Sequence, residues 1–170
     1  GPAPMLHILQ AGQRLDQLRA VGGVLADPVL TLFRAGGGSQ GANDDWSTGV
    51  DGARLPAVAA QAGAFALPAG SRDAALLVQP TAGAYTVQLT GKAATAGVAL
   101  VEAYDISSGG AVAPLVNLSA RTRVGTGAEV LIAGFVIAGT EPKRLLIRGV
   151  GPTLAAFGLT GILADPQVAV

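Results

Sequence analysis

The sequence predicts an all-β fold, a jelly-roll-like β-sandwich with two or three short helices at its edges. Half of the residues are hydrophobic but only 4% are aromatic, so the core has to be built from Ala, Val, Leu and Ile. The 25 Gly and 10 Pro residues interrupt the chain often, whereas Val, Ile and Thr favour a pleated surface. Several short segments alternate apolar and polar residues with a period of two. Short strands separated by turns are typical of two packed sheets or a barrel.

The length of 170 residues predicts a single module over residues 1–170, with roughly 70% of the unfolded chain's surface buried on folding. Within it, residues 1–4, "GPAP", are interpreted as a tag remnant or a processed end. The chain contains no cysteine, which excludes disulfides, thiol chemistry and cysteine metal sites. Its start lacks the pattern of a signal peptide. We therefore expect that any export signal lies outside this sequence.

Net charge and hydropathy exclude two classes of partner. The formal net charge is +0, whereas nucleic-acid binding draws its affinity from clustered Lys and Arg. The apolar run "VLIAGFVIAG" at 130–139 is about half of the ~20 residues that a membrane helix needs. We expect neither a nucleic-acid partner nor membrane insertion.

A strand–helix–strand segment occurs twice, at residues 6–33 and 144–170. The pentapeptide "VLADP" at 24–28 corresponds to "ILADP" at 162–166, and the preceding "LHILQA" corresponds to "LLIRGV". One residue is inserted in the first copy. An ordered series of matches of this kind indicates an internal duplication. The matched pairs are Gly12 and Gly151, Leu15 and Leu154, Leu18 and Phe157, and Gly23 and Gly161.

The duplicated segment has readable local chemistry. Pro152 suits the first position of a short helix, because its missing N–H has no helical partner there. Gly158 or Gly161 is expected to end that helix, as Gly22 and Gly23 do in the first copy. Asp-Pro then prevents helical continuation, and a strand begins. That strand places Leu30 and Leu32 on one face and Val29, Thr31 and Phe33 on the other.

Between the two copies the pattern predicts one helix and several strands. The helix is expected at 54–64, from the helical spacing of apolar residues. Residues 84–91 and 98–105 alternate as two half-buried strands would, and "GKAATAG" between them predicts a hairpin over 84–105. Further strands are expected at 74–79, 114–121, 129–138 and 143–150. Because the strand at 129–139 is apolar on both faces, we expect it to be central and covered on both sides, or covered on one side by another molecule.

The stretch "LVNLSARTRVGTGAEVLIAGFVIAGTEPKRLLIRGVGPTLAAFGLTGILADP" resembles the opening half of a repeat in large secreted proteins of verrucomicrobial-type bacteria. The stretches "DPVLTLF", "NDDW" and "GAYTVQLTGKAATAGVALVEAYD" resemble its closing half, which here comes first, so the chain is out of phase with that repeat. The resemblance implies an extracellular or cell-surface location. The closing half is more loosely similar to the jelly-roll pre-peptidase C-terminal domains of secreted enzymes, which implies an accessory role.

The densest polar cluster, "NDDW", follows a glycine-rich turn. Asn43, Asp44 and Asp45 offer hard oxygen ligands for Ca²⁺, with Asp27 or Asp51 joining from nearby turns. The alternative is an Asx-rich loop in which these side chains bond to their own backbone. An EF-hand is excluded, because the alternating ligands that end in a Glu at the twelfth position are missing.

Three further features carry little chemistry. Trp46 is either a sugar-stacking platform or, as we expect, a packing anchor. His7 is the sole histidine and lies in an apparent strand without a nucleophile motif. The Gly-x-Gly at 124–128 precedes a strand, so it is interpreted as a turn and not as a phosphate-binding loop. We therefore expect no enzymatic activity.

The leading functional hypothesis is a structural module that associates with copies of itself or with adjacent repeat modules. The alternative is an accessory module that binds calcium or carbohydrate, with a glycan as partner. Basic residues in the C-terminal third and acidic residues near 27–51 are interpreted as solvated faces or as complementary ends of neighbouring subunits. The candidate assembly residues are Leu6, Ile8, Leu9, Leu145, Ile147, Leu163, Val168 and Val170.

Overall fold

The structure is a computed structural model that describes residues 7–12, 23–106, 116–127, 129–137 and 142–170. The chain divides into two compact units, Gly1–Val116, called unit 1, and Asn117–Val170, called unit 2. Leu6, a candidate assembly residue, lies outside the described residues.

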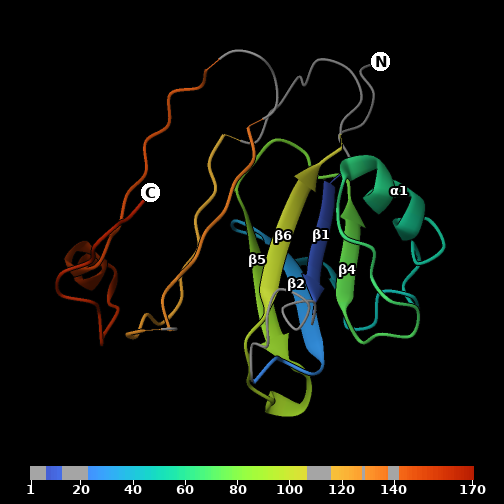
Figure 1. Cartoon of the computed structure of the whole chain (residues 1–170), viewed down its shortest axis with the longest axis horizontal. Helices are drawn as coiled ribbons and strands as arrows, with labels where there is room; N and C mark the ends of the chain where they lie inside the picture. The colour runs from blue at the N-terminus through green and yellow to red at the C-terminus, as the bar shows by residue number, and fades with distance from the viewer. Residues whose placement is uncertain (1–6, 13–22, 107–115, 128, 138–141) are drawn as a thin grey trace. The chain divides into compact units, whose positions relative to one another are not determined.

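In its described residues, unit 1 contains two three-stranded sheets whose strands all pair antiparallel, so a β-rich fold is confirmed (Figure 1). In the first sheet the order is β4-β1-β6, and in the second it is β3-β2-β5. The duplicated segment thus supplies the central strand of both sheets, β1 and β2. The bounds are β1 His7–Gly12, β2 Pro28–Arg34, β3 Ser39–Asn43, β4 Ala74–Val78, β5 Tyr85–Gly91 and β6 Leu100–Asp105.

One apolar cluster joins the two sheets. Leu30 and Leu32 of β2 are buried with Ala74 of β4, while Val29 and Thr31 on the other face of β2 are half-buried. The predicted division of β2 into two faces is confirmed. Partly buried side chains complete this cluster: Leu76, Val78, Tyr85, Val87 and Leu89.

The helix α1 (Leu55–Ala62) lies within the predicted range 54–64. A proline in its first turn starts it, and Gly63 ends it in the left-handed conformation with φ 70°. Leu55 and Ala59 are buried in a second cluster with Trp46 and Ala75. Because Ala75 alternates with Ala74 along β4, this cluster covers the face of the first sheet that points away from the second.

The predicted hairpin over 84–105 is wrong, because β5 pairs with β2 and β6 pairs with β1. The connection passes through the 3-10 helix η2 (Lys92–Ala94) and then forms hydrogen bonds with residues 23–25, which precede β2. The N–H of Leu25 donates to the carbonyl of Val98 at 2.8 Å, and the N–H of Val98 donates to the carbonyl of Gly23 at 2.8 Å. These bonds form a parallel bridge that carries the chain from one sheet to the other.

The strand β3 was not predicted, since its sequence SQGAN has low β propensity. It forms as an edge of the second sheet by pairing with β2, with a register shift between Leu32 and Phe33.

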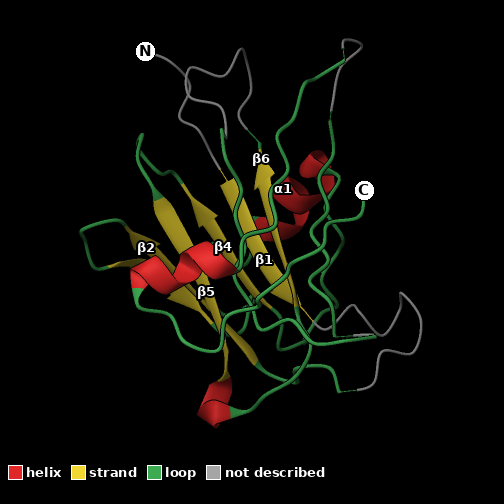
Figure 2. Cartoon of the chain, turned by 90° about the vertical axis from the view of Figure 1, so that its left-hand side faces the viewer, coloured by secondary structure: helices red, strands yellow, loops and turns green. Residues whose placement is uncertain are grey.

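Unit 2 is mostly extended chain without strands in its described residues (Figure 2). The strands predicted at 114–121, 129–138 and 143–150 are therefore not formed wherever the structure describes these ranges. The physical reason is that a strand requires a paired neighbour, and local alternation does not supply one. The 3-10 helix η3 (Pro152–Phe157) is formed, with its proline in the first turn and Gly158 at its end with φ 75°, as the sequence predicted.

The turn predicted at 124–128 is present where the structure describes it. The N–H of Gly125 donates to the carbonyl of Glu129 at 2.7 Å, and the N–H of Glu129 donates to that of Thr126 at 3.2 Å. Across the described part of the chain, no helix combines the length and the hydropathy needed to cross a membrane.

Candidate functional site

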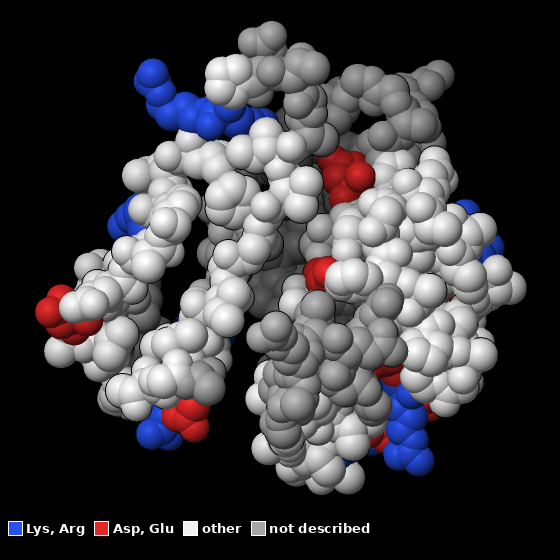
Figure 3. All heavy atoms as spheres, viewed as in Figure 1, with Lys and Arg blue, Asp and Glu red and all other residues white. Residues whose placement is uncertain are grey.

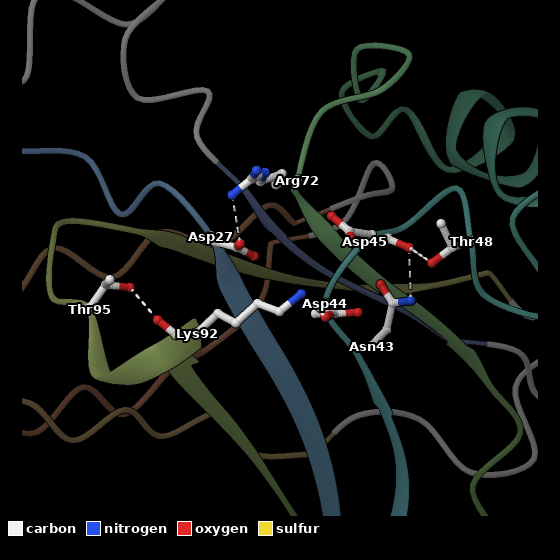
Figure 4. A network of polar contacts seen from close by, with 8 residues as sticks. All are labelled: Asp27, Asn43, Asp44, Asp45, Thr48, Arg72, Lys92 and Thr95. Carbon is white, nitrogen blue, oxygen red and sulfur yellow. Dashed lines mark hydrogen bonds and ion pairs between the residues drawn. The ribbon is translucent and has the colours of Figure 1, made fainter.

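The loop Asn43–Asp45 ties the end of β3 to neighbouring backbone. The side-chain carbonyl of Asn43 accepts the N–H of Ala75 at 3.0 Å, and its amide donates to the carbonyl of Asp45 at 3.1 Å. The hydroxyl of Thr48 donates to the same Asp45 carbonyl at 2.9 Å (Figure 4). For Asn43 this is the local bonding of an Asx-rich loop, which the sequence left open as the alternative to a calcium site.

Two ion pairs engage the acidic side chains nearby (Figure 4). Asp27 is buried, and its Oδ2 accepts from the guanidinium of Arg72 at 3.0 Å. The Nζ of Lys92 donates to Oδ2 of Asp44 at 2.6 Å, and the N–H of Lys92 donates to the carbonyl of Asp27 at 2.8 Å. These contacts fasten the start of β2 to the segment before β4, to β3 and to η2.

The contact between Asp44 and Lys92 shifts both groups toward their charged forms. The hydrogen bond from Lys92 lowers the pKa of Asp44, and the same hydrogen bond raises the pKa of Lys92. Both side chains are exposed, so solvent screens the pair and it adds little to stability.

Within the described residues, no group of three or more His, Cys, Asp or Glu side chains is placed to hold a metal ion. Lys92 contacts both Asp27, through its backbone N–H, and Asp44, through its side chain. The carboxylate of Asp27 is bonded to Arg72 and that of Asp44 to Lys92. Asp51 is elsewhere, paired with Arg54 at 3.0 Å. One carboxylate oxygen, Oδ1 of Asp27, is buried without a hydrogen-bond partner. Arg72 and Lys92 were not identified from the sequence, because each is an isolated cation in a turn without a motif.

Trp46 is buried and packs on Leu55, Ala59 and Ala75. Its indole N–H donates to the hydroxyl of Ser71 at 3.2 Å and to the carbonyl of Pro68 at 3.3 Å. The ring is therefore a packing anchor, as expected, and not an exposed surface for a sugar.

The second candidate site is the second copy of the duplicated segment. Matching residues are buried in the first copy and exposed in the second, although their sequences correspond. Asp27 of the first copy is buried, whereas its counterpart Asp165 in the second copy is exposed. The apolar pairs differ in the same direction. The exposed fractions are 5% at Leu25 and 44% at Leu163, 0% at Leu30 and 51% at Val168, and 4% at Leu32 and 102% at Val170.

The remaining candidate assembly residues fall into two groups. Ile8 and Leu9 lie in β1, whose backbone pairs with β4 on one side and β6 on the other. Leu145 and Ile147 of the second copy are exposed. The first copy therefore has no open strand edge at β1, and Leu145, Ile147, Leu163, Val168 and Val170 of the second copy are exposed.

Comparison with known proteins finds no family model that matches the chain and no curated protein or solved structure that is similar to it.

Proposed function

We propose that this chain is a non-catalytic structural module that assembles with copies of itself or with adjacent repeat modules. The two sheets joined by one apolar cluster support a jelly-roll-like sandwich as its fold. The resemblance to repeats of secreted bacterial proteins supports an extracellular or cell-surface location. The contact uses the second copy of the strand–helix–strand segment, residues 144–170.

The difference in exposure between the two copies is the observation that carries this proposal. The first copy becomes the centre of two sheets because β3, β4, β5 and β6 flank its strands. The second copy has the same apolar pattern but exposes it. Since fully burying a Leu or Val side chain is worth about 1.5–3 kcal/mol, covering Leu163, Val168 and Val170 favours association.

The alternative, an accessory module for calcium or carbohydrate, has less support in the geometry. Asp27 and Asp44 are bonded to Arg72 and Lys92, and Trp46 is buried. A calcium ion at the loop 43–45 would have to displace Lys92 from Asp44.

Light scattering across a range of protein concentrations tests the proposal. The mean mass of the wild type is expected to rise with concentration, and Val168→Asp should suppress that rise because it puts a charge into the apolar contact. Gln167→Asp is the matched control, since Gln167 is exposed and alternates with Val168 along the chain. A wild-type protein that stays monomeric at the highest concentration would contradict the proposal.

Ile132→Asp extends this test to residues before the second copy. Ile132 is exposed, so we expect the variant to express in soluble form and to assemble less. The sequence interpretation of 129–139 as a covered strand predicts the opposite result, an insoluble variant.

A further inference from the structure

The strands β5 and β6 are edge strands, one in each sheet of unit 1. In the described residues β5 pairs with β2 alone, and β6 pairs with β1 alone. The two strands lie on the same side of unit 1 (Figure 1). The outer edge of such a strand presents N–H and C=O groups that an added strand can pair with.

The face of β6 that points toward the second sheet is uncovered. Through their shared partners in β1, Val101 lies in register with Ala74 and Ala103 lies in register with Leu76. Ala74 and Leu76 belong to the cluster between the sheets, so Val101 and Ala103 point the same way. Ala74 is fully buried, whereas Val101 is 43% exposed and Ala103 is exposed. Opposite them, the inward residues of β5 are only partly buried: Val87 and Leu89.

The opposite side of unit 1 is closed. Asn43 at the end of β3 bonds to the backbone of Ala75 in β4 at 3.0 Å, and the N–H of Trp46 donates to the carbonyl of Asp73 at 2.8 Å. Apolar surface between the sheets is therefore open at β5 and β6, and we call this the open side.

Residues 129–137 have the properties of a strand that lacks partners. Their apolar side chains are exposed on both faces, including Ile132, Phe135 and Val136. A fully extended strand of this length spans about 30 Å. It is longer than β5, which has seven residues, and β6, which has six. Segment 129–137 can thus pair along the whole of either edge.

The order of the duplication indicates which copy supplies this segment. Residues 117–143 stand directly before the second copy of the strand–helix–strand segment, so they accompany that copy and not the strands β1 to β6 that precede them. Their place in the repeat order thus associates segment 129–137 with the second copy of the duplicated segment.

Charge favours a contact between unlike units. Unit 1 contains six Lys and Arg residues and eight Asp and Glu residues. Unit 2 contains five Lys and Arg residues and three Asp and Glu residues. The excess is therefore negative in unit 1 and positive in unit 2, which favours pairing of unit 1 with unit 2 over contacts between like units. Charged side chains are sparse among the uncharged atoms on the face shown in Figure 3.

We propose that the open side of unit 1, at β5 and β6, binds residues 129–137 of a second copy of this chain. The inference rests on the proposed assembly function and adds two contact surfaces to the one proposed at residues 144–170. The contact joins different surfaces of the two molecules, so it is heterologous and generates rings or open filaments.

Disulfide cross-linking between two variants tests this contact, because the chain has no native cysteine. One variant carries Ala103→Cys on the open side, and the other carries Ala133→Cys in the bound segment, with different tags. Mixing and mild oxidation should give a mixed dimer, since a disulfide forms only when the Cα atoms approach within about 7 Å. The control pair replaces Ala103→Cys with Gln88→Cys, which is exposed on the other face of β5, and should give little or no mixed dimer. Circular dichroism checks that each variant folds, with Val101→Cys as the replacement for Ala103→Cys.

Each outcome separates the inference from the proposed function. Oligomers without a mixed disulfide between positions 103 and 133 would overturn the inference and leave the assembly function standing. A monomeric disulfide within one chain carrying both cysteines would also overturn it, because the segment would then close its own unit 1. A protein that is monomeric at every concentration would overturn the assembly function itself.

Discussion

The matched pair Leu25→Ala and Leu163→Ala measures how differently the two copies are used. Both leucines stand in the sequence "LADP", but Leu25 is 5% exposed and Leu163 is 44% exposed. Removing three buried carbons costs about 2.4 kcal/mol at ~0.8 kcal/mol each, and Leu→Ala changes in cores reach about 2.7–5 kcal/mol with the cavity included. For Leu25 we expect a loss of about 3 kcal/mol in the free energy of unfolding.

For Leu163 the same change removes half-exposed carbons and leaves no enclosed cavity, so we expect about 1 kcal/mol or less. It also lies in unit 2, outside the core of unit 1. In urea, with a slope of about 1.5 kcal/mol/M, Leu25→Ala should lower the midpoint of unit 1 by about 2 M. Leu163→Ala should leave that midpoint nearly unchanged and reduce the concentration-dependent mass in light scattering. Equal midpoint shifts, or a larger shift from Leu163→Ala, would refute the reasoning.

Three further predictions concern the polar groups. Arg72→Ala leaves the buried Asp27 without its cation and should lower the free energy of unfolding in urea by about 2 kcal/mol. Arg54→Ala, which breaks an exposed pair, should lower it by no more than about 0.5 kcal/mol. Equal losses would show that the burial of Asp27 does not matter. Burial, followed by the hydrogen bond to Glu102, raises the pKa of Tyr104 to about 12. Because the folded protein holds this phenol proton more tightly than the unfolded chain does, the protonated Tyr104 stabilises the fold. This contribution is complete below pH ~10, where the unfolded tyrosine titrates, and is lost as the pH rises toward 12. Tyr104→Phe should remove this part of the alkaline loss, about 1 kcal/mol after allowance for partial exposure, and an unchanged pH profile would argue against it. Melting curves in Ca²⁺ and in chelator should coincide, because Asp27 and Asp44 are already paired with Arg72 and Lys92. If calcium did bind, a hundredfold excess over its Kd would add about 2.7 kcal/mol to the free energy of unfolding. A clear rise in the melting temperature with Ca²⁺ would restore the loop 43–45 as a metal site.

The sequence by itself determined the features that depend on neighbouring residues. The two faces of β2, the helix α1 and the start and end of η3 follow from side-chain period, proline geometry and glycine at positive φ. The Asx-rich loop at 43–45 was also among the sequence interpretations, and the bond from the Asn43 amide to the carbonyl of Asp45 is local, as that interpretation requires.

Only the tertiary structure decided which strands pair. β5 and β6 are consecutive and alternate well, yet they belong to different sheets, and Val98 between them bonds to residues 23 and 25, before β2. The ion pair of Asp27 with Arg72 likewise joins residues far apart in the sequence.

The duplicated segment gives the physical reason most directly. Leu30 and Val168 occupy the same place in the repeat, but Leu30 is buried because β3 and β5 pair with β2 and the first sheet covers it. Val168 has the same local pattern and is exposed. Alternation of side chains specifies which face of a strand is apolar, whereas the neighbours that pair with the backbone and cover that face come from distant parts of the chain or from another molecule.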